Sequence, residues 1–598
     1  MTETTTIIHH LERNARRQGA RAAIHDKTTG SWRRRNWREY NLLTRRFGKA
    51  LMAAGFGEGD PLAILGANRP EWVIGALGAM RVGGISAGIY TSCSPEEIQY
   101  VLEHSEASVI VVETLEQLGR VQQVWDSLPH LKSAVMMEGA GASDDSRVSS
   151  WEDFLDSGSD VSDEELDARL DALRPDQVAD FIYTSGTTGP PKAVMLTHEN
   201  LVWTAEAMGS NVDLTTEEVA LSYLPLSHVV EQLNSIAMAT VFGYQVHFCH
   251  DGLQLAEYLP EVRPTMFFGV PRVWERFESG IKGKMAEATG AKAKISEQAQ
   301  QVGREFIASQ NAGGTPSKLL GAKYQAAEKL VFSKVKAAIG LDRCKVFVSG
   351  AAPIPAATLE FFSSMGIAVT EGYGQSEGTG AGTINVTGGN RYGTVGPTVP
   401  GVEIKIAEDG EILVGGKNLF AGYYKNQEAT DETIIDGWLH SGDLGKVDDD
   451  GFLSIIGRKK DIIITSGGKN IAPQNIEELL SGIDIVGTPI VVGEQQRFLI
   501  ALLTLEPDAA ARFAEEHGLD VENLHEDPKV RSHIEEAIAK DVNPQMARVE
   551  HIRNFAILPN EFTTETGELT PTLKVKRNVV NDKYANDIAA AYEAGQVL

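Results

Sequence analysis

The stretch Tyr183-Thr184-Ser185-Gly186-Thr187-Thr188-Gly189-Pro190-Pro191-Lys192 decides how the rest of this chain is interpreted. Its glycines let the backbone approach a polyphosphate closely and turn N–H groups toward it. The serine and threonine hydroxyls and the Lys192 ammonium are further donors to phosphate oxygens. The loop is not a Walker A sequence, because two prolines separate Gly189 from Lys192. Taken alone, it is as consistent with a flexible turn as with a phosphate site.

Around this loop the hydrophobic pattern alternates between helices and strands. Apolar spacing predicts helices at 37–54 and 71–81, and strands at 60–65, 107–112, 178–183, 345–349 and 404–414. Such alternation is typical of an α/β domain with parallel strands. Residues 276–340 are rich in Ala, Lys, Glu and Gln and predict two helices joined by a break at 313–316. A strand at 462–465 begins what we expect to be a second, smaller domain.

Charge and cysteine usage narrow the class of protein. A formal net charge of -27 argues against nucleic-acid binding, which needs clustered Lys and Arg. Residues 141–180 hold thirteen Asp or Glu against three Arg, and we expect a surface excursion with short helices there. The cysteines, Cys93, Cys249 and Cys344, have no metal or disulfide spacing, so we expect a reducing, cytoplasmic location. No apolar signal core or membrane-spanning run is present.

The quoted loop resembles the signature loop of the adenylate-forming superfamily, which includes acyl-CoA synthetases, firefly luciferase and the adenylation domains of peptide synthetases. Six further segments match this superfamily in the same order: Leu224–His228, Ser349–Pro353, Glu371–Glu377, Asp436–Asp443, Gly457-Arg458 and Leu569–Lys574. Ala193 stands where a glycine is usual, and Ser376 where a threonine is common. Both departures keep a small or hydroxyl-bearing side chain, so we expect the chemistry to survive.

The resemblance covers nearly the whole chain and implies its organisation. We expect a large α/β N-terminal adenylate-forming domain of several subdomains at 1–457, with a helical insertion at about 276–340. A hinge at 458–461 and a small, mobile α+β C-terminal domain at 462–598 would follow. The implied reaction activates a carboxylate with ATP as an acyl adenylate and transfers the acyl group to coenzyme A.

Two anions must meet in this reaction, so the site must neutralise charge. The resemblance makes Glu377 the carboxylate ligand of Mg²⁺, with Thr184 nearby. The implied ATP contacts are Thr184, Ser185, Gly186, Thr187, Thr188, Gly189, Lys192, Gly350, Ala351, Ala352, Glu371, Gly372, Tyr373, Gly374, Gln375, Ser376, Asp443 and Arg458. Among them, Tyr373 would stack on adenine and Asp443 would hold the ribose hydroxyls.

Lys574 is the implied catalytic lysine, and its neighbour Lys576 is the main competitor for that role. The superfamily turns its C-terminal domain between the two half-reactions, with Lys460 at the hinge position. Rotation would withdraw Lys574 and present Gly467, Gly468 and Lys469 to coenzyme A. His228 is implied near the acyl carboxylate, although a core histidine explains it nearly as well.

The segment at 263–275 resembles the long-chain, bubblegum-type branch of the acyl-CoA synthetases, as does the ending at 569–577. The implied acyl contacts are Phe268, Gly269, Val270 and Trp274, with Phe267 and Val273 as further candidates and Trp274 as a gate. Plain core packing explains these aromatic residues about as well. The basic stretch 281–340, with ten Lys or Arg against four Glu, is interpreted first as a solvated face and secondly as a contact for anionic lipid headgroups.

Three alternatives remain open at this point: an acyl-AMP ligase that loads a carrier protein, a luciferase-like oxidative enzyme, and a non-catalytic lipid-binding relative. The chain carries no visible carrier domain. The expected small-molecule partners are a fatty acid, ATP and coenzyme A, with Mg²⁺ as cofactor. The oligomeric state stays open, a dimer included.

Overall fold

The computed structural model describes residues 5–139, 145–184, 190–570 and 574–598. Seven strands form the sheet that leads into the phosphate loop, in the order β7-β6-β5-β3-β4-β8-β9. Their bounds are β3 (Pro61–Leu65), β4 (Ile85–Ile89), β5 (Val109–Val112), β6 (Ser133–Met136), β7 (Val148–Ser150), β8 (Val178–Thr184) and β9 (Lys192–Thr197). All neighbouring pairs are parallel except β8 with β9. The predicted parallel α/β architecture is therefore confirmed.

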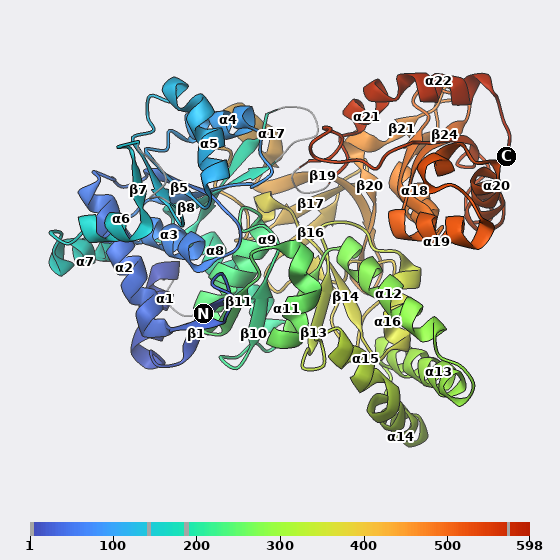
Figure 1. Cartoon of the computed structure of the whole chain (residues 1–598), viewed down its shortest axis with the longest axis horizontal. Helices are drawn as coiled ribbons and strands as arrows, with labels where there is room; N and C mark the ends of the chain where they lie inside the picture. The colour runs from blue at the N-terminus through green and yellow to red at the C-terminus, as the bar shows by residue number, and fades with distance from the viewer. Residues whose placement is uncertain (1–4, 140–144, 185–189, 571–573) are drawn as a thin grey trace.

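Helices cover both faces of this sheet, and its inner strands β3, β4 and β5 are buried along their whole length (Figure 1). The main covering helices are α2 (Trp37–Ala53), α3 (Pro70–Arg81), α4 (Pro95–Ser105), α5 (Leu115–Val124) and α8 (His198–Ser210). Side chains that accept the first free backbone N–H groups start several of them; Asn36 and Ser94 form capping boxes on α2 and α4. The predicted helices and strands of this region agree with the observed ones to within two residues.

Two four-stranded sheets continue the N-terminal part, in the orders β10-β11-β1-β2 and β12-β13-β14-β15. Their bounds are β1 (Ala22–Asp26), β2 (Arg33–Asn36), β10 (Val219–Ser222), β11 (Gln245–Phe248), β12 (Met266–Gly269), β13 (Val346–Ser349), β14 (Val369–Tyr373) and β15 (Thr383–Ile384). A further sheet joins β16 (Glu403–Ile406), β17 (Glu411–Gly415), β18 (Ile434–Ile435), β19 (Trp438–Val447) and β20 (Leu453–Arg458). The predicted strand at 404–414 is two strands, β16 and β17, joined by a turn.

The C-terminal part folds around its own sheet, β23-β24-β25, and its own hydrophobic core. Its elements are β21 (Ile463–Ile464), β22 (Asn470–Ile471), α18 (Pro473–Ser481), β23 (Val486–Val492), β24 (Leu499–Leu505), α19 (Pro507–His517), α20 (Pro528–Ala537), β25 (Ile552–Ile557), α21 (Arg577–Lys583) and α22 (Ala585–Glu593). This mixture of helices and a small sheet forms a separate lobe beside the N-terminal sheets (Figure 1).

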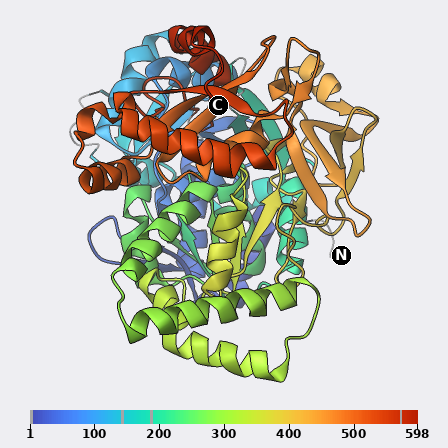
Figure 2. The ribbon, with the colours of Figure 1, turned by 90° about the vertical axis from the view of Figure 1, so that its right-hand side faces the viewer.

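The predicted helical insertion projects from the N-terminal part, away from the C-terminal lobe, as Figure 2 shows. It contains α13 (Ala291–Asn311), α14 (Lys318–Ala327), the π-helical turn η5 (Glu328–Phe332) and α15 (Ser333–Ala338). The break predicted at 313–316 is confirmed between α13 and α14. A second break, ending at Gly290 with φ +61°, separates α13 from α12 (Pro271–Ala286), so α12 is not part of the projecting hairpin. In the part of the chain that the structure describes, no helix is long and apolar enough to cross a membrane.

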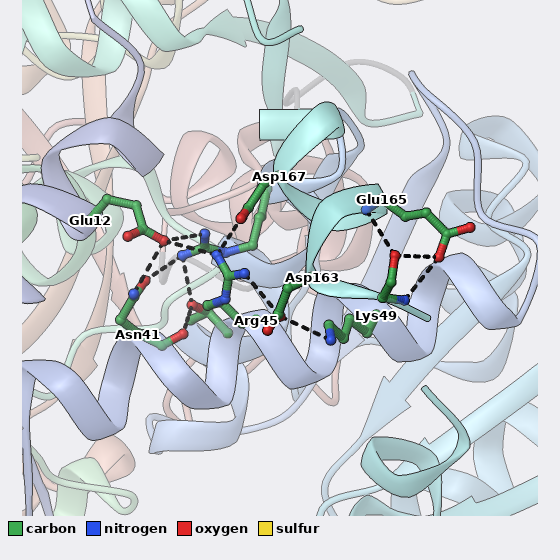
Figure 3. Close-up of polar contacts among 10 residues, drawn as sticks. Glu12, Asn41, Arg45, Lys49, Asp163, Glu165 and Asp167 are labelled. Atoms are coloured by element: carbon green, nitrogen blue, oxygen red, sulfur yellow. Dashed lines mark hydrogen bonds and ion pairs between the residues drawn. The ribbon is translucent and has the colours of Figure 1, made fainter. Parts of the chain in front are cut away.

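The acidic stretch before β8 forms two short helices at the surface, as the sequence predicts, and these helices also pack on α2. Its helices are α6 (Trp151–Ser157) and α7 (Asp163–Asp171), and Trp151 is buried against Phe47 of α2 with ring centroids 4.9 Å apart. Figure 3 shows Asp163 and Asp167 of α7 facing Arg45 of α2, at 3.0 and 2.7 Å. The acidic residues thus hold α7 on α2 by ion pairs that composition alone could not locate.

Candidate functional site

A cavity of about 1350 Å³ lies where the N-terminal sheets meet the C-terminal lobe. Residues far apart in the sequence form its wall. They come from β8, β14, β19 and β20 and from the C-terminal lobe. The sequence-predicted residues in this wall are Thr184, Lys192, His228, Phe268, Gly350, Ala351, Ala352, Glu371, Gly372, Tyr373, Gly374, Gln375, Ser376, Glu377, Asp443, Arg458, Lys460 and Lys574. One cavity therefore collects most of the residues that the motifs singled out.

Thr184 and Lys192, the described residues at the ends of the phosphate loop, lie in the cavity wall at the antiparallel pair β8 and β9. The two residues are register partners, and the Thr184 hydroxyl donates to the Lys192 carbonyl over 3.4 Å. The predicted contacts Ser185, Gly186, Thr187, Thr188 and Gly189 lie outside the described residues. The flanking strands nevertheless fix where the loop leaves and rejoins the sheet.

Asp443 is a carboxylate of the cavity wall with three side-chain partners. Its Oδ2 accepts hydrogen bonds from the Tyr373 hydroxyl at 2.8 Å and from Gln375 Nε2 at 2.7 Å, and its Oδ1 accepts from Arg458 Nε at 2.8 Å. Asp443 and Arg458 face each other across the paired strands β19 and β20. Burial disfavours the charge on Arg458, but Asp443 outweighs it and raises the pKa of the guanidinium. Four residues of three separate motifs thus form one rigid polar cluster.

Glu377 and Lys192 come together through Tyr423, a residue that no motif predicted. The Tyr423 hydroxyl donates to Glu377 Oε1 over 2.8 Å, and the Lys192 ammonium lies 4.7 Å from the centre of the same ring. Tyr423 lies beside β9 although it is far from β9 in the sequence. The Met195 N–H of β9 donates to the Gly422 carbonyl, and the Tyr424 N–H donates to the Ala193 carbonyl of β9. A sequence signal for this role is absent, because it depends on that long-range pairing.

The residues present fit a magnesium ion that is bound together with a nucleotide. Among the described residues, no group of three or more His, Cys, Asp or Glu side chains could hold a metal by itself. Mg²⁺ in nucleotide sites needs only one or two protein ligands, since phosphate oxygens and water supply the others. Glu377 offers a carboxylate and Thr184 a hydroxyl in the same cavity wall, which is the donor set such an ion requires.

Lys574 reaches the cavity from the C-terminal lobe. The backbone around it is held by an isolated bridge between Leu569 and Val575 and by a hydrogen bond from Lys574 N–H to Thr570 Oγ1 at 3.0 Å. Lys574 is solvent-exposed and lines the cavity. Desolvation, followed by repulsion from Arg458, lowers its pKa, while Asp443 and Glu377 oppose that shift. Arg458, Asp443 and Glu377 are among the residues that the sequence predicted to bind ATP or Mg²⁺; we call this part of the cavity its nucleotide end.

His228 lines the same cavity as Lys574. Burial, with a smaller effect from Lys574, lowers the pKa of His228 to about 4, so the ring is neutral at pH 7. Its Nδ1 accepts a hydrogen bond from Val230 N–H at the start of α9 (Val229–Gln232), over 3.3 Å. His228 therefore both caps a helix and borders the cavity, and the two interpretations of the sequence are compatible.

The predicted hinge residue borders the cavity, whereas the predicted coenzyme A residues do not. Lys460, between the two lobes, is part of its wall. Gly467, Gly468 and Lys469 form the exposed turn between β21 and β22 and are not part of the wall. The lobe is thus oriented with Lys574 toward the cavity and the predicted coenzyme A turn away from it.

The predicted acyl contacts divide into cavity and core residues. Phe268 and its neighbour Phe267 border the cavity, whereas Gly269 and Val270 do not. Trp274 is fully buried, donates its ring N–H to the Gly269 carbonyl at 3.2 Å, and packs on Phe267 and Phe362. In this conformation Trp274 is a core residue and lines no channel, which corrects its assignment as an acyl contact.

An apolar wall that the sequence did not predict surrounds the other end of the cavity. It is formed near the end of α8 and by the π-helical turn η3 (Leu233–Met238), and its members include Met208, Val212, Leu214, Val229, Val230, Leu233 and Met238. These residues come from an ordinary apolar periodicity that looks like core packing. Only their position beside His228 distinguishes them from the rest of the core.

Comparison with known proteins places these features in context. The sequence profile of the AMP-binding enzymes matches residues 11–424, and that of the AMP-binding enzyme C-terminal domain matches 460–596. The chain is 37% identical over 620 residues to the long-chain-fatty-acid–CoA ligase ACSBG2 of Xenopus laevis, covering 98% of this chain and 84% of that protein. It is 39% identical over 551 residues to the long-chain-fatty-acid–CoA ligase FadD15 of Mycobacterium tuberculosis, covering 91% and 89%.

A solved structure with the same fold is that of o-succinylbenzoate coenzyme A synthetase (MenE) from Bacillus subtilis in complex with ATP and a magnesium ion. It superimposes with a TM-score of 0.68 at 20% sequence identity and covers 95% of this chain and 98% of the other. At that identity the likeness concerns the fold alone.

Proposed function

The chain belongs to the AMP-binding enzyme family, and from that premise we propose that it is a long-chain fatty acid–CoA ligase that works through an acyl adenylate. Its reaction is ATP, fatty acid and coenzyme A to acyl-CoA, AMP and diphosphate. The observation that supports this most strongly is that Lys574 of the C-terminal lobe lines the same cavity as Asp443, Arg458 and Glu377. A cytoplasmic location agrees with this proposal and is part of it.

In the first half-reaction, a carboxylate oxygen forms a bond to the α-phosphorus of ATP and diphosphate leaves. Lys574 lines the same cavity as His228 and Asp443, in which a carboxylate and the α-phosphate would meet. An ammonium there stabilises the negative charge that builds up in the transition state. Desolvation and Arg458 lower the pKa of Lys574, and the negative charges of Asp443 and Glu377 oppose that shift. When bound, Mg²⁺ at Glu377 and Thr184 would neutralise charge on the phosphates.

The polar cluster around Asp443 serves the nucleoside. The two carboxylate oxygens of Asp443 suit the paired hydroxyls of a ribose, and Tyr373 offers an aromatic face beside the small residues Gly350, Ala351 and Ala352. Ala351 has φ +73°, so the backbone at this point is already in a left-handed conformation that brings it close to a flat ligand. The nucleoside would thus find its donors and acceptors already oriented.

In the second half-reaction, the coenzyme A thiol attacks the acyl carbon and AMP leaves. The turn Gly467-Gly468-Lys469 lies outside the cavity while Lys574 lies inside it. A rotation of the C-terminal lobe at Lys460 would exchange the two. Glycines suit the turn, because a narrow pantetheine arm must pass close to the backbone.

The acyl chain would occupy the apolar end of the cavity, between η3, the end of α8 and Phe268. Each buried CH₂ group contributes about 0.8 kcal/mol, so an apolar channel discriminates acids by length cumulatively. The apolar wall favours long-chain acids over short ones such as acetate. The similar proteins are long-chain-fatty-acid–CoA ligases, which favours the same substrates.

The projecting hairpin is the part of the molecule that best fits a contact with anionic lipid. Leu319 and Leu330 on the continuous helix from α14 to α15 are 68% and 55% exposed. Four exposed lysines surround them: Lys318, Lys323, Lys329 and Lys334. Within the described residues none of these ammonium groups pairs with a carboxylate, whereas the neighbouring Lys336 does. Each such lysine near an anionic surface contributes about 1 kcal/mol.

Vesicle co-sedimentation tests the lipid contact. Binding to anionic vesicles should exceed binding to zwitterionic ones, and Lys323→Glu with Lys329→Glu should abolish the difference. Lys446→Glu, an exposed lysine on β19, is the matched control. Equal binding to both vesicle types would remove the lipid contact from the proposal without touching the ligase activity.

ATP–diphosphate exchange across acids from acetate to oleate, followed by detection of the acyl thioester, tests the proposed activity. Exchange that rises with chain length and yields acyl-CoA is the expected result. Exchange without a thioester would favour an acyl-AMP ligase that loads a carrier protein. Absence of exchange with every acid would favour a non-catalytic lipid-binding relative.

A further inference from the structure

Glu411, the first residue of β17, is a buried carboxylate that none of the sequence motifs singled out. It is 6% exposed, although it lies between the nucleotide end of the cavity and the hinge. Its Oε1 accepts the backbone N–H of Gly442 at 2.8 Å. Its Oε2 accepts from the Lys459 ammonium at 3.1 Å and lies 3.2 Å from His440 Nδ1. Both oxygens are therefore occupied, by groups from β19 and from the turn that follows β20.

The two main partners of Glu411 flank the Asp443–Arg458 pair. Gly442 directly precedes Asp443, and Lys459 directly follows Arg458. Gly442 has φ +70°, a left-handed conformation that its N–H contact to Glu411 helps to fix. Glu411 thus binds Gly442 and Lys459, which are the chain neighbours of Asp443 and Arg458.

Lys459 has a second partner on the same side of the hinge. Its ammonium contacts Asp409 at 2.5 Å, and Asp409 in turn accepts the Glu411 backbone N–H at 3.2 Å. These contacts tie the residue before Lys460 to the N-terminal part. The Lys459 ammonium is about half exposed, so solvent screens the ion pairs and geometry matters more than their strength.

Asp461, the residue after Lys460, is tied in the opposite direction. Its Oδ2 accepts from Gln474 Nε2 of α18 at 3.0 Å and lies 3.9 Å from Arg577 Nε. Both partners belong to the C-terminal lobe. Lys460 is consequently flanked on one side by a residue fixed to the N-terminal part and on the other by a residue fixed to the C-terminal lobe.

We propose that Glu411 is a positioning residue that couples the loop carrying Asp443 to the hinge, so that rotation of the C-terminal lobe is confined to Lys460 and does not disturb the nucleotide cluster. Glu411 does not touch the substrates. It acts through Gly442 and Lys459, which keeps Asp443 and Arg458 in place while the lobe turns. The consequence in the proposed ligase is retention of the adenylate between the two half-reactions.

The electrostatics of Glu411 agree with this role. Burial disfavours its ionisation, but the Gly442 N–H, Lys459 and His440 together outweigh burial and lower its pKa. The facing groups from β19, β20 and the β16–β17 turn are thus donors or cations, apart from Asp409, which shares Lys459 with it. The carboxylate is charged at neutral pH and needs that charge to hold Lys459.

Glu411→Gln tests the coupling, because a glutamine can still accept the Gly442 N–H but cannot pair with the Lys459 ammonium. Trypsin cleavage after Lys459 and Lys460 in the intact protein reports on the hinge without any catalysis. We expect the variant to be cut there several-fold faster than the wild type, with an unchanged thermal midpoint. Glu408→Gln, at an exposed neighbouring carboxylate, should be cut at the wild-type rate.

Two further measurements separate the coupling from a loss of fold. AMP affinity by calorimetry should fall several-fold in Glu411→Gln, and the fraction of acyl adenylate released to solvent in a single turnover should rise several-fold. Lys459→Arg should behave as the wild type, whereas Lys459→Met should resemble Glu411→Gln.

The adenylate measurement rests on the proposed ligase function, whereas the trypsin and AMP measurements do not. Failure of the coupling can therefore be distinguished from failure of the ligase proposal. A folded Glu411→Gln protein with wild-type cleavage and AMP affinity would overturn the coupling.

Discussion

The two ends of the cavity are built in different ways. At the nucleotide end, Asp443 accepts three hydrogen bonds, Glu377 accepts one, and Lys574 arrives from the C-terminal lobe. At the acyl end, the wall is formed by apolar side chains of α8, η3 and β12 that hold position only by packing. Hydrogen bonds fix the positions of individual atoms, whereas apolar packing determines the shape of the space that a ligand can occupy. The nucleotide end should therefore treat all acids alike, and the acyl end should discriminate among them.

The largest effect that separates the ends is expected from Lys574→Ala. Loss of one preorganised charge in an enclosed site typically costs 100- to 1,000-fold in rate, so adenylate formation should fall by about 1,000-fold for every acid. Thioester formation from supplied acyl adenylate should change only a few-fold, because the proposed rotation would withdraw Lys574 from the cavity for that step. Rapid-quench measurement of both steps checks this.

Lys576→Ala is the control for that experiment, since Lys576 lies outside the cavity wall. Its adenylation rate should remain near the wild-type value. Equal losses in both half-reactions for Lys574→Ala would contradict the division of labour between the two lobe orientations.

Asp443→Asn should have the next largest effect. An amide turned toward Arg458, Tyr373 or Gln375 places a donor against a donor and removes the charge that Arg458 pairs with. Hydrogen bonds to charged groups contribute about 1.5–3 kcal/mol, so the KM for ATP should rise about 10- to 100-fold. Steady-state kinetics with a short and a long acid should show the same factor. A factor that depended on the acid would erase the distinction between the two ends.

Met238→Trp probes the acyl end in the same way. Met238 is 7% exposed in the η3 wall, and a larger ring would shorten the apolar space by a few CH₂ groups. At about 0.8 kcal/mol per CH₂, kcat/KM for the longest acids should fall about 10-fold or more while shorter acids change little. Leu253→Trp, at a residue 85% exposed, is the control. Uniform loss for all acids would instead indicate damage to the nucleotide end.

The last effect concerns stability rather than activity, at Glu371, which contrasts with Asp443 within the same wall. Burial, with repulsion from Glu478 of the C-terminal lobe, raises the pKa of Glu371 to about 8. A carboxyl group whose pKa is raised on folding stabilises the fold fully below its unfolded value near 4.5, and that contribution is lost as the pH rises toward 8. Glu371→Gln should therefore gain stability relative to the wild type by up to about 1 kcal/mol per pH unit across that window.

Chemical denaturation of both proteins at several pH values from 5 to 8.5 measures the Glu371 effect. Glu408→Gln, which alters an exposed carboxylate, should show no such trend. A stability difference between wild type and Glu371→Gln that stayed constant with pH would mean that Glu371 is ionised throughout.

Local sequence was enough to predict most of the fold, and many of the predicted site residues line one cavity. The helices α2 and α3 and the strands β3 and β5 follow from apolar periodicity, because their burial patterns are regular. The break between α13 and α14 follows from its glycines and proline. The additional break before α13 was missed because alanine-rich sequence continues through it, and composition could not show that α7 is paired with α2.

What the sequence determined by itself is which loops and charges this protein possesses, since short motifs around Thr184, Glu377, Asp443 and Lys574 carry their chemistry in a few adjacent residues. Only the tertiary structure decided how they meet: Tyr423 joining Lys192 to Glu377, Glu411 joining Gly442 to Lys459, and Trp274 packed in the core. The physical reason is that such contacts link residues up to hundreds of positions apart. They exist only after the sheets and the C-terminal lobe have packed, so no local pattern encodes them.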